Sequence, residues 1–91
     1  MDKFYYVYVL TSERDGKFYI GYTDDLKKRL NDHNKGKVPS TKNRTPLKLV
    51  YYEACLNQQD ATKRERQLKT TWGGRYLKSR LKEYLTGQGK I

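Results

Sequence analysis

The apolar positions of this 91-residue chain gather in three short runs that predict β-strands. Residues 4–11 (FYYVYVLT) are dense in aromatic and β-branched residues and too short for a helix, so they predict a strand with apolar neighbours on both faces. Asp15-Gly16 is a hairpin signal, and residues 17–22 (KFYIGY) predict the returning strand. Residues 47–54 (LKLVYYEA) predict a third strand.

Helical patterns occupy much of the remaining chain. Thr23-Asp24-Asp25 supplies an N-cap and first-turn acids for a helix that should end near Gly36. A second helix is predicted to begin within residues 57–60 and to end before Gly73-Gly74. A third helix should follow over residues 75–85.

Length and charge narrow the class of protein. The chain suits one small domain, which we expect to span residues 1–86, with residues 87–91 as a disordered tail. Lys and Arg number 20 against 10 Asp and Glu, and residues 26–91 hold seventeen of the bases but five of the acids. Such localised positive charge favours a polyanionic partner, of which nucleic acid is the commonest in cells. A solvated lysine-rich surface explains the charge alone equally well.

The compartment is indicated by features that the sequence lacks. Cys55 is the only cysteine, so neither an intramolecular disulfide nor a Cys-rich metal site can form. No apolar run approaches the roughly 20 residues that cross a bilayer. The sequence starts without a signal-peptide pattern. We therefore expect a cytoplasmic protein.

Two tyrosines of the predicted hairpin share one face. A two-residue turn at Asp15-Gly16 makes the numbers of paired residues sum to 31, and a four-residue loop makes them sum to 29. Either odd sum places Tyr8, Tyr19 and Gly21 on one face of the sheet. In the second register Gly21 lies opposite Tyr8, and its missing side chain leaves room for a substrate or a ring. Tyrosine is also a good strand former, so a purely structural role for each ring stays open.

The first predicted helix carries an arginine and the only histidine on its apolar face. Leu26, Arg29, Leu30 and His33 stand at i, i+3, i+4 and i+7, a stripe that should face the core. Arg29 and His33 are one turn apart and can reach a common target. A guanidinium there can clamp a phosphate or stabilise a pentavalent phosphorus, and an imidazole can move a proton. Alternatively, both side chains snorkel past the edge of the stripe to solvent.

The second predicted helix repeats this pattern with an acid. Ala61, Glu65, Leu68 and Trp72 form an i, i+4, i+7, i+11 stripe, and Glu65 is its only carboxylate. An inward carboxylate needs a partner, which can be a buried arginine such as Arg29, a proton or a metal ion. A single oxygen ligand, with water and substrate phosphate completing the shell, is an arrangement that Mg²⁺ uses.

Together these residues resemble a known family. They stand in an ordered set of motifs: Tyr6-Val7-Tyr8, Tyr19-Ile20-Gly21, Arg29 and His33 within DDLKKRLNDHNKGK, and Glu65 within ATKRERQLK. Over residues 4 to about 85 this set is similar to the motifs of the GIY-YIG nuclease superfamily. The resemblance is narrower to its small stand-alone bacterial members, which are similar to the nuclease domain of the structure-specific resolvase subunit. It implies an α/β (α+β) fold, in which three helices flank a three-stranded antiparallel sheet. It also implies metal-dependent hydrolysis of DNA phosphodiester bonds.

The resemblance further implies a role for each site residue. Glu65 would hold one Mg²⁺ or Mn²⁺ against the scissile phosphate, and Arg29 would stabilise the charge of the transition state. Tyr8 and Tyr19 would position or deprotonate the attacking water, and His33 would assist that proton transfer or orient a tyrosine. Because an unperturbed tyrosine has a pKa near 10, a metal or Arg29 must favour the phenolate, or the ring merely orients water. The first motif departs from the family, since Tyr6 replaces its glycine, which could narrow the cleft beside Tyr8 and change substrate choice.

Substrate binding is predicted around a basic loop with two prolines, residues 36–46. The candidate contacts carry donors suited to phosphate oxygens: Lys35, Lys37, Thr41, Lys42, Arg44 and Lys48. Such contacts hold the backbone without distinguishing sequence, so we expect salt-sensitive binding to branched, nicked or single-stranded DNA, as in repair or recombination. A homodimer or a protein partner could extend this reach. The alternative function is a nucleic-acid-binding module of the same fold with weak or no catalysis.

Overall fold

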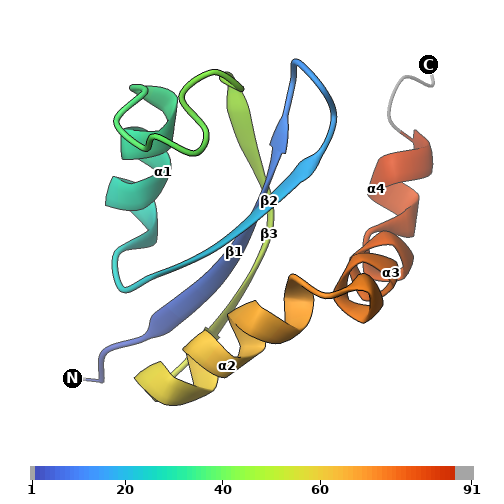
Figure 1. Cartoon of the computed structure of the whole chain (residues 1–91). Helices are drawn as coiled ribbons and strands as arrows, with labels where there is room; N and C mark the ends of the chain where they lie inside the picture. The colour runs from blue at the N-terminus through green and yellow to red at the C-terminus, as the bar shows by residue number, and fades with distance from the viewer. Residues whose placement is uncertain (1, 88–91) are drawn as a thin grey trace.

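A three-stranded antiparallel sheet, in the strand order β2-β1-β3, organises the chain. The computed structural model describes residues 2–87 (Figure 1). In chain order the elements are β1 (Tyr5–Ser12), β2 (Phe18–Thr23), α1 (Leu26–Asn34), β3 (Leu47–Cys55), α2 (Gln58–Leu68), α3 (Thr71–Arg80) and α4 (Lys82–Gly87). The expected α+β fold is confirmed, although the described residues form four helices instead of three.

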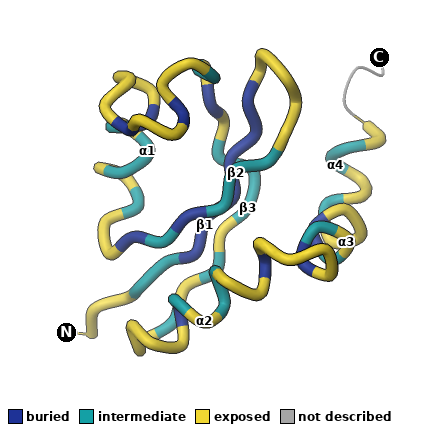
Figure 2. The backbone as a smooth tube through the Cα atoms, in the orientation of Figure 1, coloured by how far each residue is buried: buried dark blue, intermediate teal, exposed yellow. Residues whose placement is uncertain are grey.

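The sheet separates two small cores, and the central strand β1 contributes to both. On one face, Val7 and Val9 pack with residues of α2 and α3. On the other face, Tyr8 and Leu10 pack with leucines of α1 and β3. This alternation follows from the two-residue period of a strand, and it buries β1 along most of its length (Figure 2). The α1 face and the α2–α3 face lie on opposite sides of the sheet (Figure 1).

The β1–β2 hairpin adopts the longer of the two registers that the sequence allowed. Tyr8 pairs with Gly21 and Leu10 with Tyr19, so the numbers of paired residues sum to 29. The turn is therefore the four-residue loop 13–16, which ends in Gly16 at φ 69°. That left-handed conformation favours glycine. Tyr8, Tyr19 and Gly21 consequently share one face, as the strand parity predicts.

Helix α1 begins and ends as predicted. The Asp25 side chain caps its N-terminus by accepting the Lys28 backbone N–H at 3.2 Å. Gly36, at φ 75°, follows the last turn and donates its N–H to the His33 carbonyl at 3.1 Å. The stripe of this helix faces the sheet, because its leucines pack on the second core and His33 is buried.

The third helix begins earlier than predicted, at residue 71 and not at residue 75. Helix α2 ends at Leu68, and α3 begins at Thr71, because the Thr70 hydroxyl accepts the Gly73 backbone N–H at 3.1 Å and caps a new helix. Gly73 and Gly74 therefore lie inside α3 and do not end α2. The local N-cap takes precedence over the low helix propensity of the two glycines.

Two other expectations change at the same end of the chain. The predicted inward position of Trp72 is wrong, because Trp72 belongs to the first turn of α3 and is exposed. The single helix expected over residues 75–85 is divided, since α3 ends at Arg80 and α4 follows after Leu81. The predicted disordered tail lies outside the described residues except for Gly87, the last residue of α4. Within residues 2–87, no helix is both long and apolar enough to cross a membrane.

Gly73 allows α3 to approach the end of α2. A Cβ at this position would overlap backbone atoms of Leu68, which cannot swing aside as the tip of a side chain can. We expect Gly73→Ala to lower the free energy of unfolding by about 1–3 kcal/mol. Gly74→Ala is the matched control, because its Cβ would meet open space and should leave stability unchanged or raise it by up to about 1 kcal/mol. Urea unfolding measures both, and equal stabilities would contradict the close approach.

Candidate active site

Tyr8 is the centre of the candidate site. Its side chain is 1% exposed, although it carries a polar hydroxyl. The ring crosses Gly21 of the neighbouring strand, and a Cβ at position 21 would overlap the hydroxyl end of the ring. Glycine at position 21 therefore lets the Tyr8 ring lie across β2 while its hydroxyl reaches side chains of α1.

His33 of α1 connects Tyr8 to the loop between α1 and β3. Its Nε2 lies 2.8 Å from the Tyr8 hydroxyl oxygen, and its Nδ1 lies 2.7 Å from Oγ1 of Thr41. Both His33 and Thr41 are 0% exposed. The contact with nucleic acid predicted for Thr41 does not fit this buried position, because its hydroxyl points at the imidazole and away from solvent. The three side chains form one buried hydrogen-bonded chain.

Arg29 and Tyr19 complete the cluster. Arg29 Nε donates a hydrogen bond to the Tyr8 hydroxyl oxygen at 3.3 Å from a half-buried position. The Tyr19 ring stands edge-on to the imidazole of His33, with centroids 5.1 Å apart. The Tyr19 hydroxyl accepts a hydrogen bond from Ser40 at 3.4 Å. The fold therefore brings four of the five predicted catalytic residues into one cluster, in which each contacts at least one of the others.

Burial sets the charge of the imidazole. Removal from water and, to a smaller extent, the positive charge of Arg29 lower the pKa of His33 from 6.5 to about 4. His33 is therefore neutral at pH 7, with one ring nitrogen that donates and one that accepts. Tyr8 and Thr41 occupy these two nitrogens, so the chain can move a proton without creating an unpaired buried atom.

The phenol of Tyr8 is also neutral in the resting protein. Burial raises the pKa of Tyr8, and the hydrogen bond and charge of Arg29 oppose that rise. The charges of Tyr19 and Glu65 add to the rise. Any group that offsets the negative charge of Glu65 will therefore favour loss of the Tyr8 proton. The same hydrogen bond raises the pKa of Arg29, which stays cationic.

Glu65 belongs to α2, the helix that packs on the other face of the sheet. Its side chain is 20% exposed and forms an ion pair with Lys69 at 3.0 Å, one turn further along the helix. Arg29 bonds to Tyr8, so the Glu65–Arg29 ion pair considered from the sequence is not formed. Among the causes that shift the pKa of Tyr8, the negative charge of Glu65 is the smallest, so Glu65 is coupled only weakly to the hydroxyl cluster.

The described part of the chain offers a cation few protein ligands. Nowhere in residues 2–87 do three or more His, Cys, Asp or Glu side chains gather into a metal-binding group. A cation bound at Glu65 would therefore have a single carboxylate ligand, with the rest of its shell supplied by water and substrate. That composition suits Mg²⁺ or Mn²⁺ and is unsuited to a structural zinc site.

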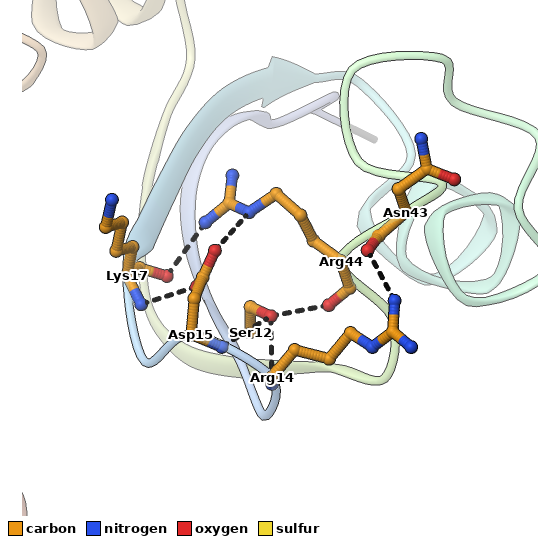
Figure 3. A network of polar contacts seen from close by, with 6 residues as sticks. All are labelled: Ser12, Arg14, Asp15, Lys17, Asn43 and Arg44. Atoms are coloured by element: carbon orange, nitrogen blue, oxygen red, sulfur yellow. Dashed lines mark hydrogen bonds and ion pairs between the residues drawn. The ribbon is translucent and has the colours of Figure 1, made fainter.

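The basic loop is anchored to the β1–β2 hairpin through Arg44 (Figure 3). Arg44 Nε pairs with Asp15 at 3.2 Å, and its Nη2 donates to the Lys17 carbonyl at 3.1 Å. The Ser12 hydroxyl donates to the Arg44 carbonyl at 2.6 Å. Arg44, predicted to bind phosphate, is therefore already engaged in these contacts. The other predicted phosphate contacts are exposed lysines: Lys35, Lys37, Lys42 and Lys48.

The sequence does not predict that Ser40 and Thr41 contact the site residues. Both lie in a polar loop, where no period indicates which hydroxyl turns inward. The one available signal is Val38, an apolar loop residue that is buried in the structure. Its burial indicates that the loop folds back over the sheet, and this brings the two hydroxyls to His33 and Tyr19.

Acid should destabilise the protein between pH 6.5 and pH 4. His33 is the only histidine, and its folded-state pKa of about 4 lies below the value of 6.5 expected for the unfolded chain. The unfolded chain therefore takes up the proton first, so stability is full above pH 6.5 and falls by on the order of 2 kcal/mol as the pH approaches 4. Urea unfolding across this range measures the slope. His33→Gln should remove most of the slope between pH 6.5 and pH 5, which lies above the range where carboxyls with a lowered pKa, such as Glu53 and Asp32, take up protons. An unchanged slope in that upper range would contradict the assignment.

Fold and site together define a class of protein. It is a small α+β domain in which two tyrosines on a three-stranded sheet meet an arginine and a histidine from one helix, with a glutamate on a second helix. The profile of the GIY-YIG catalytic domain matches residues 4–76. The chain belongs to the GIY-YIG nuclease family.

Small bacterial proteins are similar to this chain over most of its length. A UPF0213 protein of Streptococcus pneumoniae serotype 4 is 44% identical over 70 residues, which cover 76% of this chain and 70% of the relative. A UPF0213 protein of Streptococcus agalactiae serotype V is 48% identical over 65 residues, covering 70% and 73%. The solution NMR structure of a UPF0213 protein from Bacillus halodurans superposes with a TM-score of 0.56 at 30% identity, covering 97% of this chain and 99% of the other.

Proposed function

We propose that this protein is a metal-dependent endonuclease that hydrolyses DNA phosphodiester bonds and selects its substrate by DNA structure, in repair or recombination. The observation that carries the proposal is that the Tyr8 hydroxyl is hydrogen-bonded to both Arg29 and His33. Hydrolysis of a phosphodiester needs a proton acceptor for the attacking water and positive charge at the phosphate. Tyr8 connects the two groups that supply them.

The proton follows the buried hydrogen-bonded chain. Tyr8 gives its proton to Nε2 of His33 while it takes one from the attacking water, so the phenol stays neutral. His33 Nδ1 lies 2.7 Å from the Thr41 hydroxyl, and with the imidazole proton on Nδ1 and donated to Thr41, Nε2 would be free to accept. A phosphate bound by Arg29 would offset part of the positive charge that lowers the pKa of His33. Substrate binding would thus make the imidazole a better proton acceptor.

The residues present fit a single divalent cation at Glu65. Its carboxylate is partly exposed, and it would give up only an i,i+4 pair with exposed Lys69, worth about 0.3–0.5 kcal/mol. Mg²⁺ or Mn²⁺ when bound lowers the pKa of a coordinated water and stabilises negative charge on phosphate oxygens. Arg29 would clamp a non-bridging phosphate oxygen from the α1 side.

Substrate selection is expected from shape. The four exposed lysines, Lys35, Lys37, Lys42 and Lys48, can neutralise phosphates but cannot distinguish bases. A domain this small covers little duplex, so contacts on both sides of a branch or nick would add affinity that a straight duplex does not provide. Binding should accordingly weaken steeply as salt is raised.

The test is cleavage of labelled DNA with and without metal. A linear duplex, a nicked duplex, a flap and a four-way junction of shared sequence are incubated with the protein in EDTA, Mg²⁺ or Mn²⁺. We expect cleavage only with metal and fastest near the branch, with none from Glu65→Ala. Glu83→Ala is the matched control, because Glu83 is an exposed acid on α4, and it should cleave normally.

Three outcomes would change the proposal. Cleavage that survives Glu65→Ala would indicate a contaminating nuclease and contradict the role of Glu65. DNA binding without cleavage in any metal would identify a nucleic-acid-binding module in place of an enzyme. Equal rates on linear and branched DNA would keep the chemistry and remove the selection by structure.

A further inference from the structure

The only tryptophan of the chain lies on the surface, away from the cluster around Tyr8. Trp72 is 53% exposed on the first turn of α3, although tryptophan gains more from burial than most side chains. Its ring stacks on Tyr76, one turn further along α3, with centroids 5.4 Å apart and planes inclined by 19°. Tyr76 thus supports the ring while more than half of Trp72 stays open to solvent.

Arg64 of α2 fixes this pair of rings in place. Its guanidinium lies over both rings, 5.7 Å from the Trp72 centroid and 4.9 Å from that of Tyr76. Two bonds from Arg64 to Glu53 of β3, at 2.8 and 2.9 Å, hold the guanidinium in position. Glu53 in turn accepts a hydrogen bond from Tyr51 at 2.8 Å. The arrangement is anchored on the sheet and needs little ordering before it can bind a ligand.

The two helices that carry the rings and Arg64 are strongly positive. Residues 58–80 hold seven Lys and Arg against two acids, and one of those acids, Glu65, is paired with Lys69. Six of the seven bases are exposed: Lys63, Arg66, Lys69, Arg75, Lys78 and Arg80. An exposed indole in such a setting complements a polyanion that also carries flat aromatic groups. Single-stranded nucleic acid has both properties, whereas the bases of an intact duplex are stacked on each other.

We propose that Trp72, Tyr76 and Arg64 form a stacking platform for an unpaired base of single-stranded DNA. This inference depends on the proposed function in one respect, the choice of nucleic acid as the ligand. Trp72 follows Glu65 by seven residues, which limits their separation to at most about 25 Å even for an extended segment. One strand could therefore lie on the platform and reach Glu65. The platform would favour branched or tailed substrates over straight duplex.

Fluorescence provides a direct test because Trp72 is the only tryptophan. The protein is titrated in EDTA with a 12-nucleotide single strand, with the same strand in duplex form and with an abasic strand of equal length. The single strand should quench Trp72 to saturation, and the duplex and the abasic strand should quench much less. In fluorescence anisotropy with a labelled strand, Trp72→Ala should weaken binding by at least about fivefold, and Trp72→Phe by less. Phe4→Ala is the matched control, since Phe4 is an aromatic residue 46% exposed outside the platform, and it should bind normally.

The measurements distinguish a base-binding role of Trp72, Tyr76 and Arg64 from a purely structural role in which they only hold α2 against α3. Unchanged Trp72 fluorescence in a solution where anisotropy shows the strand to be bound would overturn the proposal. So would equal quenching by duplex, or a folded Trp72→Ala that binds within twofold of the original protein. If Trp72→Ala fails to fold, quenching of the unaltered protein decides alone. Because EDTA excludes metal, a failure of the cleavage assay leaves this titration unaffected, and the reverse also holds.

Discussion

Tyr8→Phe is expected to lower the rate of DNA cleavage by about 10²–10⁴-fold, the range for loss of a positioned acid or base. The substitution removes one oxygen atom and keeps the ring that packs with Leu10 and Leu47. It removes the acceptor for Arg29 and the partner of His33 Nε2 at once. Single-turnover cleavage with enzyme in excess measures this step without a contribution from product release.

Stability has to be separated from chemistry in this variant. The buried Nε2 of His33 would lose its partner, which costs about 1–3 kcal/mol, so rates are measured well below the unfolding temperature and the fold is checked by circular dichroism. Tyr6→Phe is the matched control, because Tyr6 is a half-buried tyrosine on the same strand that packs against Tyr52. A rate for Tyr8→Phe within threefold of that of Tyr6→Phe would reduce Tyr8 to a packing residue.

Arg29→Ala is expected to lower turnover by about 10²–10³-fold and affinity for DNA much less. The guanidinium already meets the Tyr8 hydroxyl, where charge would develop, and its half-buried position strengthens its field relative to a surface lysine. We expect substrate in the ground state to be held largely by the exposed lysines. The measurement is kcat and KM on the best substrate, together with the dissociation constant in EDTA.

Two variants make the role of Arg29 specific. Arg29→Lys keeps the charge but loses the Nε donor, and it should recover only part of the rate. Lys27→Ala removes an exposed base from the same helix and should leave kcat unchanged. If Arg29→Ala lowered only the affinity for DNA, Arg29 would be a residue that binds phosphate in the ground state. The proposed role of Arg29 in stabilising transition-state charge would then be wrong.

Features that depend on near neighbours along the chain could be predicted. The helix from Leu26 follows its cap at Asp25 and its period, and this period alone places Arg29 and His33 toward the sheet. Strand parity puts Tyr8, Tyr19 and Gly21 on one face whichever turn forms. These rules act over one or two turns or across one tight hairpin, so the sequence contains nearly all of the information that they need.

Features that depend on distant contacts could not be predicted. Position 73 requires glycine because the Leu68 backbone leaves no room for a Cβ, whereas the sequence alone shows only a poor helix former. Arg44 has the composition of a phosphate contact, yet it bonds to a hairpin turn 29 residues earlier. The partner of Arg44 lies far away in the sequence, and that of Gly73 belongs to the neighbouring helix α2, whose angle to α3 the sequence does not show.

The sequence by itself determined the order of the strands and helices up to Leu68, the α+β class and the membership of Tyr8, Tyr19, Arg29, His33 and Glu65 in one candidate set. Only the tertiary structure decided how these groups meet. It brought the Thr41 hydroxyl within hydrogen-bond distance of His33 and the Tyr8 hydroxyl within that distance of both Arg29 and His33. It also left Trp72 exposed on the surface. The physical reason is that periodicity fixes the direction of a side chain relative to its own element, whereas hydrogen-bond partners and burial depend on how separate elements pack.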